Sequence, residues 1–98
     1  MGVNMFNFKI DGKYLRERSG SKLGEFDGKY IRNSNGSRVG EINGKYIRDS
    51  HGTRIAEFDG KYIRDNGNNR IGTIEDVRKE IDGPGGMSLV AFWLFFIR

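Results

Sequence analysis

The amino-acid sequence predicts an all-β protein of four tandem β-hairpins, arranged around a pseudo-fourfold axis and followed by a short apolar C-terminal helix. The first observation is an unbroken 16-residue repeat, whose second copy reads FDGKYIRNSNGSRVGE from Phe26 to Glu41. Residues 10–25, 42–57 and 58–73 are the other three copies. The second observation is that every copy holds two turn signals, and the third is an apolar run after the last copy. Repeats this short must share one core, because none can bury its apolar face alone.

The two turn signals divide each repeat into two strands. Asp27-Gly28 is typical of a two-residue hairpin turn in which both central residues have φ > 0. Asn35-Gly36 is the second signal, and two such turns leave two strands of six residues per copy. With a first strand from Met5 to Ile10, the predicted strands are residues 5–10, 13–18, 21–26, 29–34, 37–42, 45–50, 53–58, 61–66 and 69–74.

The predicted turns also define a register. They place Ile31 opposite both Gly24 and Gly40, and they place Tyr30 opposite Glu25 and its equivalent in the next repeat. The isoleucines then share one face of the sheet with these glycines, while the tyrosines lie on the other face. Equal strands without stagger do not close into a regular barrel, which favours hairpins around a central axis.

An alternative for the second turn is a four-residue type I turn closed by a glycine bulge. In repeat three it would have Asp49 at its first position and Gly52 at its fourth. That turn would reverse the faces of the strands at every repeat, so the two-residue turn is favoured.

One repeat position admits only small residues. It is occupied by Gly24, Gly40 and Gly72, and by Ala56 in repeat three. Alanine is poor at positive φ, so the pattern indicates close packing rather than an unusual backbone conformation. The opposing isoleucine and the neighbouring repeat are the expected occupants of the space.

After the repeats, the chain divides into three parts. Residues 74–81 are expected to form a last strand or a short helix, and they complete a β-repeat domain over residues 1–82. Residues 83–86 form a glycine/proline link, and residues 87–98 form an apolar C-terminal segment. Ser88–Ile97 is predicted to be a short helix with Ser88 as a candidate N-cap, although its aromatic residues would also suit a strand.

The apolar segment is the predicted partner-binding element. A helix with apolar residues on all sides must be buried on all sides, and the hairpins can cover only part of it. We therefore expect it to dock on the β domain and to contact a second copy of the protein, most simply in a homodimer. Leu89, Phe92, Trp93 and Phe96 are the expected interface residues. A membrane surface is a less favoured partner, because the run is shorter than the roughly 20 residues that span a bilayer.

The repeat resembles a known family. Units such as GKYIRNSNGSRVGE (residues 28–41), followed by a glycine-rich link and an apolar tail, resemble the bacterial β-flower repeat proteins. The resemblance covers residues 10–73 well and the tail more loosely. More distantly, the units are similar to the tyrosine-aspartate repeats of large secreted toxins, which occur in far longer chains. The resemblance to β-flowers implies a small all-β domain of uncharacterised function, with no catalytic residues.

Basic residues recur at three positions of the repeat. One set is Lys13, Lys29, Lys45 and Lys61, a second is Arg16, Arg32, Arg48 and Arg64, and a third is Lys22, Arg38, Arg54 and Arg70. In the predicted register Asp49 faces Arg54 and Asp65 faces Arg70, as in ordinary cross-strand ion pairs. The second set has no such partner. It is therefore the candidate anion-binding set, because converging arginines bind phosphate well.

The tyrosines are a candidate stacking surface for sugars or bases: Tyr14, Tyr30, Tyr46 and Tyr62. They would equally suit a half-buried strand. His51, the only histidine, occupies a turn position. With no cysteine, no clustered acids and no pair of nucleophile and base, we expect no metal, no cofactor and no enzymatic activity.

Two classes of function remain. The first is a structural or protein-interaction module that self-associates through its C-terminal segment. The alternative is an anion- or glycan-binding module that uses the arginines and tyrosines. The net charge of +4 is too small to require an acidic partner. The residues from Met1 to Ile10 hold no basic flank followed by a long apolar run, so no signal peptide is predicted and a cytoplasmic location is expected.

Overall fold

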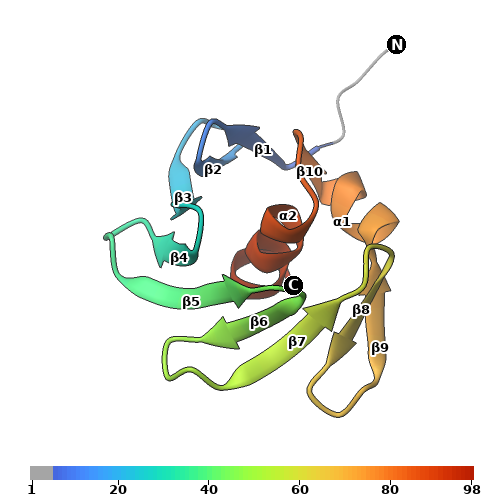
Figure 1. The fold of residues 1–98 in the computed structure, drawn as a ribbon. Coiled ribbons are helices and arrows are strands. Elements are labelled where there is room, and N and C mark those ends of the chain that lie inside the picture. The colour runs from blue at the N-terminus through green and yellow to red at the C-terminus, as the bar shows by residue number, and fades with distance from the viewer. Residues whose placement is uncertain (1–5) are drawn as a thin grey trace.

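A computed structural model describes residues 6–98, and its strands form one continuous ten-stranded sheet (Figure 1). Strands β1 to β9 lie side by side in chain order, and each pair is antiparallel. Their bounds are β1 Phe8–Asp11, β2 Tyr14–Glu17, β3 Lys22–Phe26, β4 Tyr30–Asn33, β5 Arg38–Asn43, β6 Tyr46–Asp49, β7 Arg54–Phe58, β8 Tyr62–Asp65 and β9 Arg70–Thr73. The all-β prediction is confirmed for the repeats, with strands shorter than expected. The part of the first predicted strand at Met5 lies outside the described residues.

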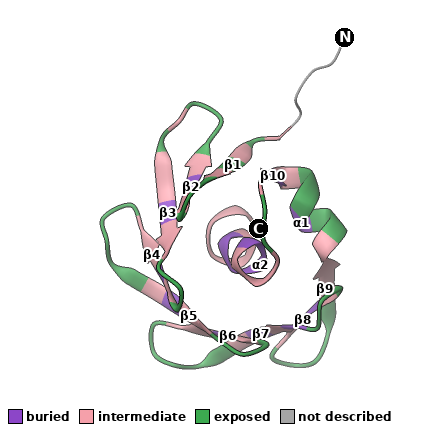
Figure 2. Cartoon of the chain, turned by 45° about the horizontal axis from the view of Figure 1, so that its top comes forward, coloured by how far each residue is buried: buried purple, intermediate pink, exposed green. Residues whose placement is uncertain are grey.

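The sheet curves around the C-terminal segment. Helix α2 (Met87–Phe92) lies in the middle of the strands, and a π-helical turn, η1 (Trp93–Ile97), continues it (Figures 1 and 2). Helix α1 (Ile74–Glu80) lies between β9 and a two-residue strand, β10 (Ile81–Asp82), which pairs in parallel with β1. The first and last parts of the repeat domain are thereby brought together.

The second turn of each repeat is the four-residue turn that the sequence analysis disfavoured. Gly52 N–H donates to Asp49 O over 3.0 Å, and Gly36 N–H donates to Asn33 O over 3.0 Å. The turn alone would reverse the faces, but a register shift between Ile31 and Arg32 follows it in the same hairpin. The bulge adds one residue to β5, and this restores the faces that the turn alone would have reversed. Ile31 therefore still lies opposite Gly40, as predicted.

The register across the first turn also differs from the prediction. Ile31 lies opposite Phe26, not Gly24, because the two-residue loop consists of Gly28 and Lys29. The shift of two residues leaves each side chain on its predicted face. Asp27 has no positive φ.

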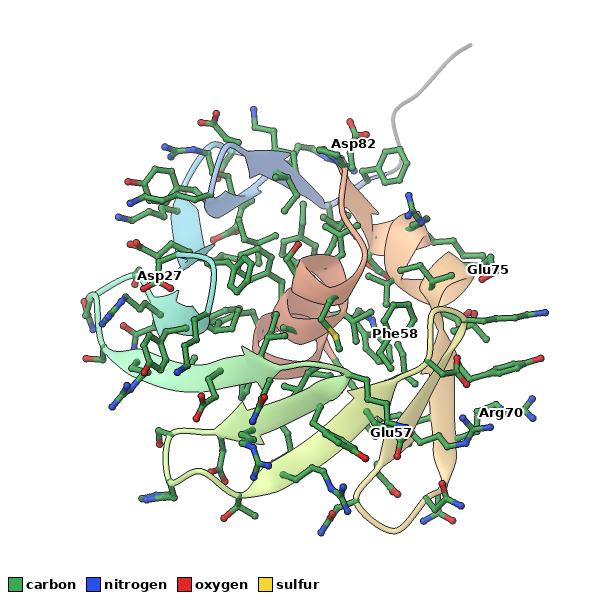
Figure 3. The ribbon with its side chains drawn as sticks, viewed as in Figure 1. Asp27, Glu57, Phe58, Arg70, Glu75 and Asp82 are labelled. Atoms are coloured by element: carbon green, nitrogen blue, oxygen red, sulfur yellow. The ribbon has the colours of Figure 1, made fainter. Side chains whose placement is uncertain are left out.

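Residues of the two faces are buried very differently. Leu15, Ile31, Ile47 and Ile63 point inward and are fully buried, whereas the tyrosines of the same strands are partly exposed. Figure 3 shows side chains such as Arg70 on the outer side of the strands, away from α2.

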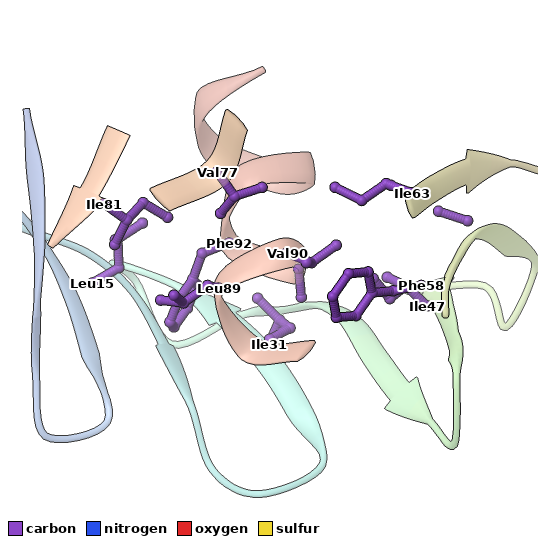
Figure 4. Close-up of a cluster of buried hydrophobic side chains, with 12 residues drawn as sticks. Leu15, Ile31, Ile47, Phe58, Ile63, Val77, Ile81, Leu89, Val90 and Phe92 are labelled. Atoms are coloured by element: carbon purple, nitrogen blue, oxygen red, sulfur yellow. The ribbon is translucent and has the colours of Figure 1, made fainter. Parts of the chain in front are cut away.

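The core forms between these residues and α2 (Figure 4). Leu89, Val90 and Ala91 are fully buried, and Phe92 is 2% exposed. A Cβ atom on Gly24 would lie 2.6 Å from Phe96 Cε2, and one on Gly72 would lie 3.0 Å from the Trp93 ring. The small-residue position therefore makes room for aromatic rings of the tail, which the prediction missed, and not for the opposing isoleucine. The prediction that the neighbouring repeat packs there is confirmed for two positions, because the Cβ atoms of residues 24 and 40 would also lie 3.0 Å from Arg32 O and 2.6 Å from Arg48 O.

Helix α1 begins where the repeat changes. Thr73 stands at the position of the repeated glutamate, and its hydroxyl accepts a hydrogen bond from Asp76 N–H over 3.3 Å. Asp76 Oδ2 in turn accepts from Thr73 N–H over 2.9 Å, which completes a capping box. The box gives hydrogen-bond acceptors to the N–H groups of Thr73 and Asp76 at the start of the helix, and it favours a helix that begins here.

The tail is helical, but its start differs from the prediction. Gly86, not Ser88, is the N-cap of α2, and no side chain caps it. The buried helix is held by packing rather than by a polar cap. No helix within residues 6–98 is long and apolar enough to cross a membrane.

Candidate anion-binding site

The outer face of each hairpin carries a tyrosine surrounded by basic groups. Around the Tyr30 ring, Arg38 Cζ lies 4.4 Å from the centroid, Lys29 Nζ lies 5.3 Å away and Arg32 Cζ lies 6.0 Å away. The same arrangement recurs at Tyr14 and Tyr62, and Tyr46 has contacts of this kind from Lys45 and Arg54. The quadrupole of each ring attracts these cations and holds them in place.

Basic residues also face each other directly across each hairpin. Arg32 is paired with Arg38 in the register. The equivalent pairs are Arg16 with Lys22, Arg48 with Arg54 and Arg64 with Arg70. Like charges at directly opposed positions are unfavourable. Their recurrence in every hairpin concentrates positive charge at four places on the outer face.

The expected ion pairs of the third basic set do not form, because the bulge moves their partners. Asp49 Oδ1 accepts backbone N–H bonds from His51 and Thr53 within the turn, instead of facing Arg54. Asp65 does the same with Gly67 and Asn69 N–H groups. In the described part of the chain, Lys22, Arg38, Arg54 and Arg70 have no carboxylate at ion-pair distance.

The second basic set was predicted to be the less paired one, and this prediction is wrong. Arg16 Nε lies 2.9 Å from Asp11 Oδ2. Arg64 Nη1 lies 2.9 Å from Asp59 Oδ2, and the corresponding pair of Arg32 and Asp27 measures 3.6 Å. Arg16, Arg32 and Arg48 also donate to the carbonyl of the turn glycine, at 2.9, 3.2 and 3.0 Å. These arginines are therefore anchored within the hairpin.

Two aspartates of these pairs, Asp27 and Asp59, are held in the charged form. Hydrogen bonds from Tyr62 and Lys61 N–H, together with the Arg64 guanidinium, lower the pKa of Asp59 to about 2. Backbone N–H groups of Tyr30 and Lys29 likewise lower the pKa of Asp27. Asp59 therefore remains a partner for Arg64 well below neutral pH.

The tyrosines are less available for stacking than predicted. Arg70 Cζ lies 4.1 Å from the Tyr62 centroid, and Lys22 Nζ lies 4.8 Å from that of Tyr14. Cations thus occupy ring faces that a sugar or base would use. The rings act as supports for charged groups.

Two of the four lysines of the first set are paired with carboxylates. Lys13 Nζ lies 3.5 Å from Glu25 Oε2, and Lys45 Nζ lies 3.9 Å from Glu57 Oε2. These carboxylates lie on the same outer face. Among the described residues, the third basic set is therefore the one in which no member is paired with a carboxylate.

The residues predicted to form an oligomer interface do not share an exposed surface. Leu89 and Phe92 belong to the core. Trp93 and Phe96 pack toward Gly72 and Gly24, although both remain partly exposed. The exposed apolar part of the tail is instead distributed over residues 93–97.

No family model, curated protein or solved structure matches this chain. The resemblance to β-flower proteins therefore stays a prediction. Residues 6–98 contain no group of histidine, cysteine or acidic side chains that could hold a metal ion. The outer face with its opposed cations is the strongest candidate site in this part of the molecule.

Proposed function

We propose that the protein is a non-catalytic binding module that holds a linear, phosphate-bearing polymer on the outer face of its hairpins. The observation that carries this proposal is the pair of directly opposed cations, such as Arg32 and Arg38, which recurs in each hairpin. A bound anion would remove the repulsion within each pair. Guanidinium groups recognise phosphate through two parallel hydrogen bonds, which suits this ligand class.

Repetition is the reason to prefer a polymer over a small anion. Each cluster is exposed to water, and a single exposed charge contact is weak. A polymer that contacts one cluster reaches the next at high effective concentration, so the four weak contacts combine. Polyphosphate and single-stranded nucleic acid share this phosphate chemistry. A neutral glycan receives less support, because cations cover tyrosine faces.

Salt-dependent binding provides the test. Labelled long-chain polyphosphate and an oligodeoxythymidylate are titrated with the protein at several salt concentrations. Arg38→Gln/Arg70→Gln removes two cluster cations, whereas Arg78→Gln/Lys79→Gln removes two charges from α1 as a matched control. If two phosphate contacts are lost, the slope of log K against log salt for the single strand falls by about 1.4. Equal affinity of both variants, or no binding of either polymer by the unmodified protein, would refute the proposal.

The two polymers also separate the possible sources of phosphate. Equal affinity at equal phosphate content is expected if the backbone alone is recognised. Stronger binding of the oligonucleotide would instead indicate that bases displace the arginines and stack on the tyrosines. Polyphosphate binding that exceeds that of the oligonucleotide points to charge density as the recognised feature.

A second candidate is self-association through the end of the tail. The supporting observation is that Trp93, Leu94, Phe95, Phe96 and Ile97 are consecutive, apolar and partly exposed. Contiguous exposed apolar surface is typical of protein-interaction sites. Sedimentation equilibrium at micromolar concentration is expected to detect a dimer, and a monomer throughout that range would contradict this candidate.

We also propose that the four hairpins are related by a pseudo-fourfold axis along α2, as expected for β-flower proteins. The equal repeat length supports this arrangement, as do the equivalent pairs Leu15–Gly24, Ile31–Gly40, Ile47–Ala56 and Ile63–Gly72. A crystal structure tests it, because successive repeats should superpose after rotations of about 90° around the tail. Unequal rotations would exclude the symmetry.

A further inference from the structure

We propose that the four clusters are not equal, and that the β6–β7 hairpin is the principal phosphate site. This inference rests on the proposed function. In it, the guanidinium groups of Arg48 and Arg54 hold one phosphate group between them. Asn43 gives this hairpin its advantage, because it stands where other repeats have an aspartate.

Arg48 differs from its equivalents in what it contacts. The other three arginines of its set pair with Asp11, Asp27 and Asp59, respectively. Within the described residues, Arg48 has no carboxylate at ion-pair distance, and it donates through Nη1 to Gly52 O over 3.0 Å. That single bond orients the side chain and leaves most of its five N–H donors for an anion.

The turn at Asn43 has the same geometry as the turn at Asp11. Asp11 lies opposite Tyr14 just as Asn43 lies opposite Tyr46. The following glycines have φ values of 62° and 65°, whereas those after Asp27 and Asp59 have values of 105° and 102°. An aspartate at position 43 would therefore reach Arg48 as Asp11 reaches Arg16. The missing ion pair follows from the residue type and not from a different backbone.

The second arginine of the hairpin is equally available. Arg54 lies directly opposite Arg48, and its Cζ lies 4.5 Å from the Tyr46 centroid. Its Nε contacts only a neutral acceptor, Asn66 Oδ1, at 3.5 Å. Two acids lie nearby. Glu57 is already paired with Lys45, and Glu41, which lies opposite Arg48 across β5 and β6, has no ion pair with it among the described residues. Two guanidinium groups without carboxylate partners thus lie on opposed strands, with one supported by an aromatic ring.

This arrangement predicts that the residue at position 43 controls the affinity of the β6–β7 hairpin for phosphate. An aspartate there would have to be displaced from Arg48 before an anion could bind, and it would then repel the anion. Removing the equivalent aspartate from another repeat should have the opposite effect. Asp11→Asn is the best choice, because its turn matches that of Asn43 and its ion pair is exposed, so the fold is little affected.

The inference is tested by titrating the protein with tripolyphosphate. Calorimetry measures the affinity, and NMR of the arginine side chains shows which residues respond. Asn43→Asp should weaken binding by about tenfold, as expected for loss of one charge-assisted contact. Asp11→Asn should add a second but weaker site, because Lys22 stands opposite Arg16 in place of a second guanidinium group. Lys79→Gln and Glu75→Gln on α1 change the net charge by the same amounts and should have much smaller effects. In the unmodified protein, the Arg48 and Arg54 signals should shift first.

The outcomes separate this inference from the proposed function. The inference fails if Asn43→Asp binds tripolyphosphate with the affinity of the unmodified protein. It also fails if Asn43→Asp loses no more affinity than Lys79→Gln does, because position 43 then has no special role. The same holds if Arg16 or Arg64 signals shift before Arg48. In each of these cases binding of long-chain polyphosphate, with its dependence on Arg38 and Arg70, would leave the proposed function standing. Loss of all long-chain binding would refute the function itself.

Discussion

Replacing Gly40 with alanine tests how closely the tail fits the repeats. A Cβ atom at this position would overlap the Phe95 ring and would lie 2.6 Å from Arg48 O. The Phe95 contact is with a rigid aromatic ring and the Arg48 contact is with the backbone of β6, so both a side chain and a strand must move. Overpacking of this kind costs about 1–3 kcal/mol, and we expect Gly40→Ala to lie near the upper limit.

The other repeats provide graded comparisons. A Cβ on Gly24 would lie 2.6 Å from Phe96 and 3.0 Å from a backbone oxygen, which predicts an intermediate cost. A Cβ on Gly72 would come no closer than 3.0 Å to Trp93. That smaller strain is offset by the roughly 0.4–1 kcal/mol gained when alanine reduces the entropy of the unfolded chain. The expected order of destabilisation is Gly40→Ala, then Gly24→Ala, then Gly72→Ala.

Urea unfolding followed by circular dichroism measures these differences. With an m-value of about 1.5 kcal/mol/M, a loss of about 3 kcal/mol lowers the midpoint by about 2 M. Phe95→Leu in the Gly40→Ala background should recover part of the loss, because the ring is one of the two obstacles. Equal midpoints for all three alanine variants, or the largest loss at Gly72, would refute the proposed fit.

Three further predictions concern the tail, the capping box and acid stability. A chain that ends at Asp82 should lack a cooperative unfolding transition in calorimetry, because Leu89 and its buried neighbours are lost from the core; a sharp transition would show that the repeats fold without the tail. Thr73→Ala should cost about 1 kcal/mol of unfolding free energy in urea, the usual effect of losing an N-cap, and an unchanged midpoint would contradict the role of the box. Because the pKa of Asp59 falls from 3.8 to about 2 on folding, its contribution to stability is present above pH 3.8 and is lost as the pH falls toward 2. Acid unfolding of Asp59→Asn should therefore be less steep in that interval, and an NMR titration that gives Asp59 an ordinary pKa would remove the basis for this expectation.

Much of the fold follows from local chemistry in the repeat. The turn glycines and the alternation around Ile31 predict the strands and the inward face, because both depend on residues close in sequence. The length of the second turn could not be decided in this way. A further bulge, in the strand near Arg38, offsets the reversal of faces that this turn causes, and the turn would be disfavoured only in a regular strand. The cap at Thr73 has a signal in the sequence, Thr-x-x-Asp, which favours a helix over a strand for residues 74–81.

The site was predicted less well than the fold, and for a related reason. An error of one residue in register exchanges an ion pair between Asp49 and Arg54 for a like-charge pair between Arg48 and Arg54. Partners of charged side chains are therefore much more sensitive to a bulge than the burial of Ile47 is. A signal for the arginine pairs did exist, since Asp59 precedes its partner by five residues and Asn43 breaks that pattern.

The position of α2 has a consequence for synthesis of the chain. The hairpins are made before the segment that fills their centre, and Leu15 precedes Leu89 by 74 residues. At typical translation rates that interval corresponds to about 4–15 s, during which the inner faces have no helix to cover them. The nascent repeats are then an aggregation-prone intermediate with exposed apolar surface, of the kind that chaperones bind. Arrival of the tail would convert this intermediate into the native state in one late step.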